Sequence, residues 1–309
     1  MTSDSVSADV TVIIPAYRAR ATIGRALASV AAQTLKPRAI VVVDDGSTDD
    51  TYAMAVDWRS RMPGIDLVVE RQSNAGAGAA RNRALSLATT TYVAFLDADD
   101  EWLPEKLART MDHFAKEPDY VLVAHDSLEV NGTREVRLDC ARRFREAIAA
   151  PFVGLYRRGY IDTTTVVARR ADVMAVGGFD QTLPNAQDFD LWLAILAPPD
   201  ARFMVFDEIL SKYHRTAGSI MTHIERRRAC CMKIAVRYAP ALRRHPGSAF
   251  VSLWFRSLAI HVEAVRAHMA ARNLAGAITT LARLPFSICA ATISAVGKPN
   301  ARVRLIAIS

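Results

Sequence analysis

The clearest indication of the fold lies in VTVIIPAYRARATIGRALASV, residues 10–30, and in the AIVVVDD that follows at residues 39–45. The stretch opens with a β-branched run typical of a buried strand, which we expect to end at Pro15. Thr22 can cap a helix in which Ile23, Leu27 and Val30 recur at helical spacing. A second apolar run follows. The stretch therefore predicts a strand, a helix and a second strand.

The same alternation continues to about residue 100. IDLVVE, residues 65–70, predicts a third strand, residues 79–88 a helix after a Gly/Ala loop, and YVAFLDADD a fourth strand that ends at Asp97. Strands that alternate with helices imply right-handed crossovers, and therefore an α/β fold with a mostly parallel sheet flanked by helices. In such sheets ligands bind beyond the carboxyl ends of the strands. Polar clusters stand at those ends: Asp44 and Asp45, then Asn74, then Asp97, Asp99 and Asp100.

Beyond Tyr120 the pattern is looser. We expect further strands at YVLVAHD, residues 120–126, and near residues 164–169, and a helix that begins near Asp188. From about Met221 the apolar spacing is helical, so we predict a sheet-containing domain over 1–220 and a helical, basic region over 221–309. Residues 284–297 run for 14 positions without a charge, which favours a buried or interfacial segment over a membrane span.

The net charge of +7 conceals an uneven distribution along the 309 residues. Lys and Arg number 13 against 17 Asp and Glu in residues 1–120, 12 against 13 in 121–220, and 14 against 2 in 221–309. Such a basic tail predicts an acidic partner, either nucleic acid or an anionic membrane surface. The four cysteines include no C-x-x-C pair and the N-terminus resembles no export signal. We therefore expect a cytoplasmic protein without structural disulfides or a zinc ribbon.

Asp97, Asp99 and Asp100 place three carboxylates within four positions, where they repel one another unless a cation or hydrogen-bond donors lie among them. If the chain is still extended here, Asp97 and Asp99 point the same way. That arrangement suits a divalent cation that also binds phosphate oxygens. Solvated loop acids, or a helix cap at Asp100, are the alternatives.

The segment DDGSTD, residues 44–49, follows the second strand. Gly46 allows a backbone to approach a ligand closely, and the acids can accept bonds from a base or a ribose; a turn with a helix cap is the alternative. Arg81 opens the helix after the Gly/Ala loop and can meet a phosphate or pair with a carboxylate. The run GAGAAR, residues 76–81, imitates a dinucleotide-binding fingerprint but has Arg where the third Gly is required, which excludes a dehydrogenase.

Gln187-Asp188-Phe189-Asp190 opens a helix, so the helix dipole favours ionised carboxylates there. An ionised carboxylate is a suitable general base for an acceptor hydroxyl. The alternative is an N-cap at Asp188 with an exposed Asp190.

Together these segments resemble the family 2 inverting glycosyltransferases of the GT-A fold. The resemblance covers residues 9–222 through VTVIIPAYRARATIGRALASVAAQT, VVVDDGSTDDT, SNAGAGAARNRAL, YVAFLDADDEW, GGFD and QDFDLW, in the order and spacing of that family. It implies a nucleotide-base pocket lined by Pro15, Tyr17 and Asp45, with Asp44 beside it and Arg81 near the phosphates. It implies that Asp97 and Asp99 bind Mn²⁺ or Mg²⁺ and the diphosphate, and that Asp188 is the base.

The reaction that the resemblance implies moves a sugar from a nucleotide-sugar donor, most commonly a UDP-sugar, to a hydroxyl of a glycan or lipid-linked acceptor. Its setting would be the synthesis of cell-surface polysaccharide or glycoconjugate. The metal would neutralise the departing nucleoside diphosphate while Asp188 takes the acceptor proton.

Two positions depart from the family pattern. Gln187 stands where Glu often precedes the base, which removes a neighbouring charge. In the run YHRTAGS, residues 213–219, Thr216 occupies the position of the usual histidine, so His214 is the candidate substitute for a contact to metal or diphosphate. Trp192 lies one helical turn after the proposed base and is a candidate for the acceptor site. Packing is the alternative for both side chains.

Three other functions compete with this interpretation. A haloacid-dehalogenase-type phosphatase needs a nucleophilic Asp after its first strand, and a sugar nucleotidyltransferase needs a Gly/Arg-rich phosphate loop with a Lys; PAYRARATIG, residues 15–24, offers neither. The third is a nucleotide- or nucleic-acid-binding protein with a degenerate transferase domain, whose contacts would be Arg226–Arg228, Arg243 and Arg244. The tail is rich in Ala, Leu and Val, which favours an amphipathic role instead, either on the inner face of the cytoplasmic membrane as a peripheral protein or in packing on the catalytic domain.

Overall fold

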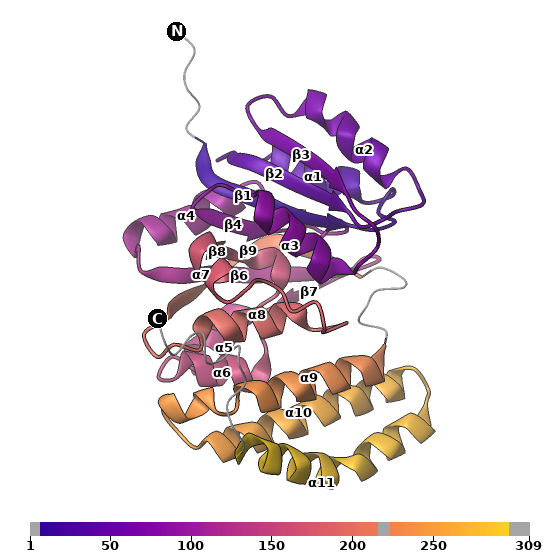
Figure 1. Cartoon of the computed structure of the whole chain (residues 1–309), viewed down its shortest axis with the longest axis vertical. Helices are drawn as coiled ribbons and strands as arrows, with labels where there is room; N and C mark the ends of the chain where they lie inside the picture. Colours follow the sequence, from indigo (N-terminus) through magenta and orange to yellow (C-terminus); the bar gives the residue numbers. More distant parts are fainter. Residues whose placement is uncertain (1–6, 216–222, 297–309) are drawn as a thin grey trace. The chain divides into compact units, whose positions relative to one another are not determined.

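The computed structural model describes residues 7–215 and 223–296. They form two compact units whose sequence ranges are interleaved. The first unit comprises residues up to 142, 161–181 and 202–216, and the second comprises 143–160, 182–201 and the chain from 217 onward. The colours of Figure 1 follow the chain through both units.

A mixed sheet is the main element of the first unit. Among the described residues it has nine strands, in the order β3-β2-β1-β4-β8-β6-β9-β5, with β7 paired to β6. Strands β3, β2, β1 and β4 are parallel, β8 is antiparallel to both of its neighbours, and β9 is parallel to β6. The strands span Ala8–Ala16 (β1), Pro37–Asp44 (β2), Asp66–Arg71 (β3), Tyr92–Phe95 (β4), Glu101–Trp102 (β5), Tyr120–Asn131 (β6), Arg134–Leu138 (β7), Val167–Arg169 (β8) and Arg202–His214 (β9). The expected α/β fold with a mostly parallel sheet is confirmed.

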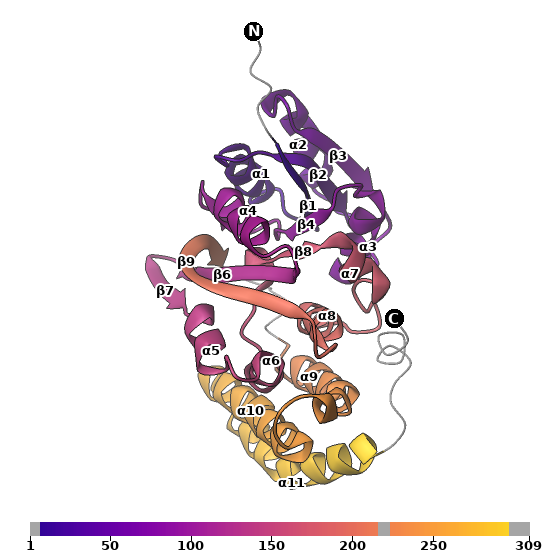
Figure 2. The ribbon, with the colours of Figure 1, turned by 90° about the vertical axis from the view of Figure 1, so that its left-hand side faces the viewer.

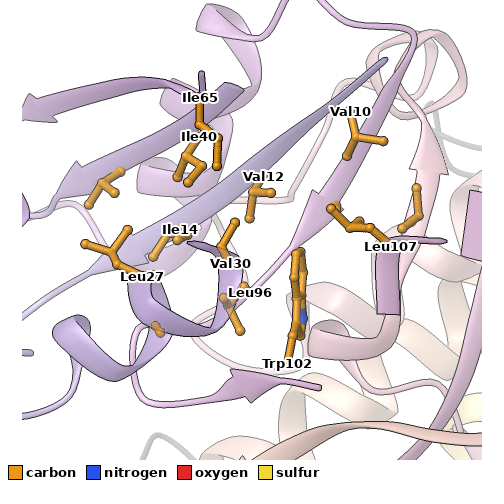
Figure 3. Close-up of a cluster of buried hydrophobic side chains, with 14 of the residues drawn as sticks. Val10, Val12, Ile14, Leu27, Val30, Ile40, Ile65, Leu96, Trp102 and Leu107 are labelled. Atoms are coloured by element: carbon orange, nitrogen blue, oxygen red, sulfur yellow. The ribbon is translucent and has the colours of Figure 1, made fainter. Parts of the chain in front are cut away.

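Five α-helices accompany these strands in the described part of the first unit. They span Ile23–Ala31 (α1), Thr51–Asp57 (α2), Ala77–Leu87 (α3), Lys106–Lys116 (α4) and Arg170–Ala175 (α7). Alternate side chains of β1 form one buried row, in which Val12 and Ile14 lie beside Leu27 and Val30 of α1 (Figure 3). The same cluster continues past the end of β4 with Leu96, Trp102 and Leu107.

β1 continues through Pro15 instead of ending there. Pro15 is paired with Val43 of β2, and the strand ends one residue later. On its other side β1 pairs with β4 only as far as Ile13, which is opposite Phe95. Because β4 does not reach Pro15, the missing N–H of the proline breaks no hydrogen bond between the two strands, and the proline is tolerated inside β1.

The elements expected in the first hundred residues are present, but several ends are shifted. β4 ends at Phe95 rather than at Asp97, and β6 extends beyond the expected residue 126 to Asn131. The sequence pattern gave no sign of β5, β7 or β9. β9 alone is 13 residues long, with the sequence RFMVFDEILSKYH, and it pairs with β6 across irregularities near Asp126. Its pairing with a distant strand, rather than a local alternation, defines it.

The second unit is helical. Its α-helices are α6 (Pro151–Arg158), α8 (Gln187–Leu196), α9 (Ile224–Tyr238), α10 (Ala249–Ala270) and α11 (Leu274–Val296). Helix α5 (Cys140–Glu146) begins in the first unit and ends in the second, because the two units divide after Arg142. Figure 2 shows α9, α10 and α11 together. Glu225 of α9 joins all three, because its carboxylate lies 3.0 Å from Arg228, 3.2 Å from His268 of α10 and 3.2 Å from Arg283 of α11. The expected helical C-terminal region is present.

The division into units differs from a single boundary at residue 220. The first unit does end near there, at Thr216, but residues 143–160 and 182–201 belong to the second unit with the C-terminal helices. Both segments lie within the predicted 1–220 domain. The helix that carries the candidate base, α8, therefore belongs with the helices of the basic region.

Lys106, at the start of α4, is fully buried in the first unit. Its Nζ lies 4.0 Å from the centroid of the Trp102 ring. Burial lowers the pKa of this ammonium group well below its ordinary value. His125 is also fully buried, and burial together with the charge of Lys106 lowers the pKa of its imidazole to about 3. A charged Lys106 is therefore destabilised in the folded protein relative to the unfolded chain.

We predict that Lys106→Met raises the free energy of unfolding at pH 7 by about 1 to 3 kcal/mol, because it removes a buried ammonium group and keeps the side-chain length. Between the lowered pKa of Lys106 and its ordinary value of about 10.4, only the unfolded chain holds the proton, so this lysine's penalty falls as pH rises. In urea denaturation the gain should shrink toward pH 10. Lys116→Met, at an exposed position of the same helix, is the matched control and should be neutral. A gain independent of pH would contradict the prediction.

Candidate functional site

The carboxyl ends of four parallel strands lie at one edge of the sheet. Ala16 of β1 is opposite Asp44 of β2, and Asp44 is opposite Arg71 of β3. Ile13 of β1 is opposite Phe95, the last residue of β4. The segments that follow these strands therefore begin at a common edge: residues 17–20, 45–50, 72–76 and 97–100. The last three contain Asp45, Asn74 and the Asp97–Asp100 acids, which the sequence analysis placed there.

Asp45 joins the end of β2 to the loop after β3. Its backbone N–H donates to the carbonyl oxygen of Ala16 at 2.8 Å. Its Oδ1 accepts from Gln72 Nε2 at 2.8 Å and from the N–H of Ala75 at 2.9 Å, and its Oδ2 accepts from the N–H of Gly76 at 2.8 Å. The side chain is almost fully buried. Asp45 therefore fixes the start of the Gly/Ala loop against the ends of β1 and β2.

Asp44 and Gly46 shape the turn on either side of Asp45. The fully buried carboxylate of Asp44 accepts from the N–H of Ser47 at 3.2 Å and lies 3.2 Å from Arg71 Nε. Gly46 has a φ of +76°, and a Cβ at that position would lie 2.8 Å from the backbone nitrogen of Asn74. The turn requires glycine for both reasons. Asp44 supports the turn and does not expose its carboxylate to a ligand.

The backbone after β1 is held by the same turn. The N–H of Arg18 donates to Ser47 Oγ at 2.9 Å, and that of Ala19 donates to Thr51 Oγ1 at 2.8 Å. Arg18 has a φ of +50°, which is uncommon for a side chain of its size. Tyr17 is 47% exposed, and the Arg18 guanidinium lies 5.2 Å from its ring centroid. An exposed aromatic ring is thus held at the edge beyond β1.

The acidic turn, residues Asp97–Asp100, follows soon after β4. The N–H of Asp100 donates to the carbonyl oxygen of Asp97 at 3.0 Å, so the chain turns here and is not the extended segment that the sequence suggested. Arg81 of α3 lies 2.5 Å from Asp97 Oδ1, and its guanidinium is 5.3 Å from the centroid of the Phe179 ring. Arg25 of α1 donates to the carbonyl oxygen of Asp99. Two basic side chains therefore hold the acidic turn against helices on either side of β1.

Asp100 is the buried member of the acidic turn. Its Oδ1 accepts from the backbone N–H of His214 at 2.9 Å. Burial, together with the charges of Asp97 and Asp99, raises the pKa of the Asp100 carboxyl well above its ordinary value. It does not cap the next helix, because α4 begins at Lys106 with Glu105 at its N-cap. Asp100 instead connects the acidic turn to the end of β9.

His214 contacts the residue that follows the acidic turn. Its Nε2 lies 3.3 Å from Glu101 Oε1, and Lys212 Nζ lies 3.6 Å from the same oxygen. His214, the candidate substitute for the family histidine, thus lies beside the acidic turn. Its side chain contacts Glu101 and its backbone N–H donates to Asp100. The contacts of Glu101 with Lys212 and His214 could not be predicted from the sequence. Glu101 and Lys212 are paired through β5 and β9, and neither strand has a recognisable sequence pattern.

The acidic turn suits a divalent cation that is shared with phosphate oxygens. In the described part of the chain, no group of three or more His, Cys, Asp or Glu side chains is placed to hold a metal by itself. Mn²⁺ and Mg²⁺ are often held by one or two carboxylates together with the phosphates of a substrate. The charges of Asp97 and Asp99 add to the effect of burial in raising the pKa of Asp100, so negative charge is concentrated here. Asp97 and Asp99 therefore fit such a cation in the presence of a diphosphate.

α8, in the second unit, carries the candidate base. Asp188 lies half-buried in the first turn of the helix, after Ala186 with a φ of +57°. Asp190 is fully buried and lies 2.5 Å from Arg237 Nη1 of α9. Its carbonyl oxygen accepts from the hydroxyl of Tyr238 at 3.0 Å. The second acid of the QDFD motif thus anchors the helix and is not the exposed acid that the sequence allowed.

Two aromatic residues of α8 complete its anchoring. The Arg256 guanidinium of α10 lies 4.6 Å from the centroid of the Phe189 ring. Trp192 is fully buried, so its ring is no open platform for an acceptor sugar and packs instead. Of the predicted residues, Asp188 and Trp192 lie in the second unit, and Pro15, Tyr17, Asp44, Asp45, Arg81, Asp97, Asp99 and His214 lie in the first.

Comparisons with known proteins show the family of this chain. Residues 11–173 match the model of the family described as glycosyl transferase family 2. The chain belongs to glycosyl transferase family 2. The protein is therefore a glycosyltransferase by family, and the family and fold that the sequence motifs predicted are confirmed.

Two relatives and one solved structure show the extent of the similarity. The chain is 32% identical over 212 residues to the amylovoran biosynthesis glycosyltransferase AmsB of Erwinia amylovora, across 66% of this chain and 68% of that protein. It is 27% identical over 214 residues to the UDP-Glc:alpha-D-GlcNAc-diphosphoundecaprenol beta-1,3-glucosyltransferase WfgD of Escherichia coli, across 69% of this chain and 80% of that protein. The mannosyltransferase PcManGT from Pyrobaculum calidifontis, solved with GDP-Man and Mn²⁺, has a similar fold, with a TM-score of 0.63, 21% identity, and coverage of 98% of this chain and 80% of that one.

We predict that Gly46→Ala destabilises the protein more than Gly64→Ala. Both glycines have similar positive φ values, +76° and +79°, so each alanine carries a conformational cost of about 1 kcal/mol. Only at position 46 does the new Cβ meet backbone, which should add at least about 1 kcal/mol. Thermal unfolding of the two variants measures the difference. Equal melting temperatures would mean that the loop fixed by Asp45 moves aside without cost.

We predict that Arg237→Met lowers the free energy of unfolding by about 3 kcal/mol, because it leaves the Asp190 carboxylate buried without its cation. The double variant Asp190→Leu/Arg237→Met should regain much of that loss, since an apolar pair of similar volume replaces both charges. Urea denaturation of the two single variants and the double variant measures the coupling. Additive losses would show that the ion pair does not anchor α8.

Proposed function

We propose that this protein is an inverting, metal-dependent hexosyltransferase. It moves a sugar from a nucleotide-sugar donor, a UDP-sugar foremost, to a hydroxyl of a glycan or lipid-linked acceptor. The observation that carries the proposal is the acidic turn Asp97–Asp100, held by Arg81 at the edge where the exposed ring of Tyr17 is also held. Membership of glycosyl transferase family 2 supports the class of reaction.

The nucleotide would bind beyond β1 and β2. The exposed ring of Tyr17 offers a face on which a base can stack, and Pro15 stiffens the backbone that leads to it. Asp45 would present its carboxylate to a donor group of the base or ribose while it orients the loop at Gly76. Asp44 would act from behind this pocket by holding the turn.

The diphosphate would bind at the acidic turn. Asp97 and Asp99 would hold Mn²⁺ or Mg²⁺, and the cation, when bound, neutralises charge that develops on the departing nucleoside diphosphate. Arg81 keeps Asp97 in place and adds a positive charge for phosphate oxygens. His214 is the auxiliary candidate on this side, through its contact with Glu101.

Asp188 would take the proton of the acceptor hydroxyl. Its carboxylate lies half-buried in the first turn of α8. The hydroxyl oxygen would form a bond to the anomeric carbon as the bond to the diphosphate breaks on the opposite face, so a single displacement inverts the anomeric centre. Gln187 beside it carries no charge that competes for the proton.

The relatives support a setting for this reaction. AmsB is named for amylovoran biosynthesis, and WfgD for transfer of glucose from UDP-glucose to a diphosphoundecaprenol-linked sugar. We extend these to cell-surface polysaccharide synthesis on a lipid-linked or growing glycan, by a protein peripheral to the inner face of the cytoplasmic membrane. A lipid-linked acceptor would place the reaction at that surface.

The test is thermal stabilisation by UDP, GDP and dTDP, each with and without Mn²⁺. A ligand at about 100 times its Kd adds about 2.7 kcal/mol, a shift of several degrees. We expect one nucleotide, UDP foremost, to give a Mn²⁺-dependent shift that Asp99→Asn abolishes. Asp66→Asn, an exposed acid at the opposite end of β3, should keep the shift. No shift with any nucleotide, or one that Asp99→Asn leaves unchanged, would overturn the proposed donor site.

Asp188→Asn separates binding from transfer in the same experiment. This variant should keep the nucleotide shift, because Asp188 is assigned to the acceptor. Transfer from labelled UDP-sugars to a bacterial lipid extract should fall on the order of a thousandfold, the usual contribution of a general base. Undiminished transfer would remove Asp188 from the mechanism. A nucleotide shift with no transfer by the wild type to any acceptor would favour a degenerate, nucleotide-binding domain.

A further inference from the structure

We propose that the outward face of α11 docks on an anionic membrane surface, with its apolar side chains inserted among the lipids. The inference extends the proposed action on a lipid-linked acceptor, and it rests on that proposed function for the reason why the protein would bind a membrane. Its physical evidence lies entirely in the second unit.

The exposed face of α11 is apolar along the helix. Leu274, Ile278, Leu281, Phe286 and Ile293 are between 53% and 77% exposed. At 3.6 residues per turn they fall within an arc of about 140° around the helix axis. The exposed residues that fill the rest of the arc are small or weakly polar: Ala275, Ala282, Pro285 and Cys289. Each carries no charge, so the arc is a continuous apolar stripe.

α10 extends this surface on one side. Trp254 Nε1 donates to Thr292 Oγ1 of α11 at 2.9 Å, so the indole lies against the last turns of α11. It belongs to a row of exposed apolar residues on the first half of α10: Phe250, Val251, Trp254, Phe255 and Leu258. Soluble monomers rarely expose contiguous apolar patches of more than a few hundred Å². A stripe along a 23-residue helix, about 35 Å long, needs a partner.

The charges around the stripe identify the partner as anionic. The described residues 240–296 hold six Arg, of which Arg256 is buried, and a single acid, Glu263. Arg272 immediately precedes α11, and Arg243 Nη2 donates to the carbonyl oxygen of Ala295 at the other end, at 3.5 Å. Arg283 stands at the border of the stripe. An apolar face with cations at its ends and border matches the interface of an anionic bilayer, where apolar insertion and attraction to lipid headgroups act together.

A second copy of the chain fits this face less well. Pairing α11 with α11 would bury the apolar stripe but would bring Arg272, Arg283 and Arg243 of one copy toward the same cations of the other. Glu225 already pairs with Arg283, and Glu263 is the one acid in the described residues 240–296 for the other cations. Like charges placed together at a protein interface cost several kcal/mol, whereas a membrane of anionic lipids supplies the compensating charge.

The stripe favours lying on the surface over crossing the bilayer. Among the described helices, Leu274–Ala295 is long and apolar enough to cross a membrane, a criterion that core helices of soluble proteins also meet. Arg283, in the middle of α11, pairs with Glu225 of α9 at 3.2 Å. His261 of α10 lies 3.2 Å from Ser287 Oγ of α11. A spanning α11 would have to give up these polar contacts, whereas docking leaves them intact and buries only the outward face.

Flotation of the full chain with vesicles tests the proposal. We expect binding to vesicles of phosphatidylcholine with phosphatidylglycerol and weaker binding to phosphatidylcholine alone. Ile278→Gln/Phe286→Gln should lower the partition coefficient at least about tenfold, because two exposed apolar side chains no longer enter the lipid. Ile148→Gln/Met174→Gln, which changes two exposed apolar residues outside α10 and α11, is the matched control and should float as the wild type does.

Further measurements distinguish surface docking of α11 from membrane spanning and from self-association. Phe286→Trp should show fluorescence quenching by brominated lipid, and sodium carbonate at high pH should release the bound protein. Equal flotation of the α11 variant and the control, or complete loss of wild-type binding in high salt, would overturn insertion of the stripe. Resistance to carbonate would overturn surface docking in favour of a span. A dimer in sedimentation that the α11 variant dissociates, without flotation of the wild type, would identify a second copy as the occupant.

The same variants keep this inference separate from the proposed function. The substituted side chains are exposed and distant in sequence from every candidate site residue, so Ile278→Gln/Phe286→Gln should keep the wild-type melting temperature and the Mn²⁺-dependent nucleotide shift. Loss of flotation with an unchanged nucleotide shift supports the docking face. Absence of a nucleotide shift in the wild type would instead count against the proposed function. The flotation result would still test the docking face.

Discussion

The site is built on the parallel pairing of β1 with β2 and β4. This pairing brings the ends of several strands to one edge, where the backbone groups of the following loops need new hydrogen-bond partners. Asp45 meets much of that need, because its carboxylate accepts from Gln72, Ala75 and Gly76. The acid that suggested a ligand contact is thus first a structural clamp. Any nucleotide contact it makes would use a group already held rigid by the loop.

Charge balance governs the other end of the site. Three carboxylates crowd the acidic turn, and burial, followed by the charges of its neighbours, raises the pKa of Asp100, so its protonated form is favoured. Arg81 offsets the charge of Asp97. Both effects reduce the net negative charge of the turn. The proposed cation would complete its coordination with phosphate oxygens of the donor.

The sequence predicted the parts of the fold that local pattern determines. Buried β-branched runs located β1 to β4, and the residues after them shared one edge as expected. It failed where distant pairing decides: β9 has no clean alternation and is defined by β6, and Pro15 remains in β1 because β4 stops short of it. It also misjudged side chains whose partners are remote in sequence. An exposed Asp190 was one alternative that the sequence allowed, because nothing near it in the sequence indicates its partner Arg237, 47 residues away.

The second unit gives the C-terminal helices a role beyond a basic appendage. α8 is tied to α9 by the Asp190–Arg237 pair and to α10 by Arg256 over Phe189, so the helix of the candidate base has its anchors in those helices. The same helices carry the apolar stripe and its cations. Within this unit, therefore, the position of Asp188 relative to the docking face is set by packed helices rather than by a linker. An acceptor held at a lipid surface by the proposed docking face would then meet the proposed base at a fixed height.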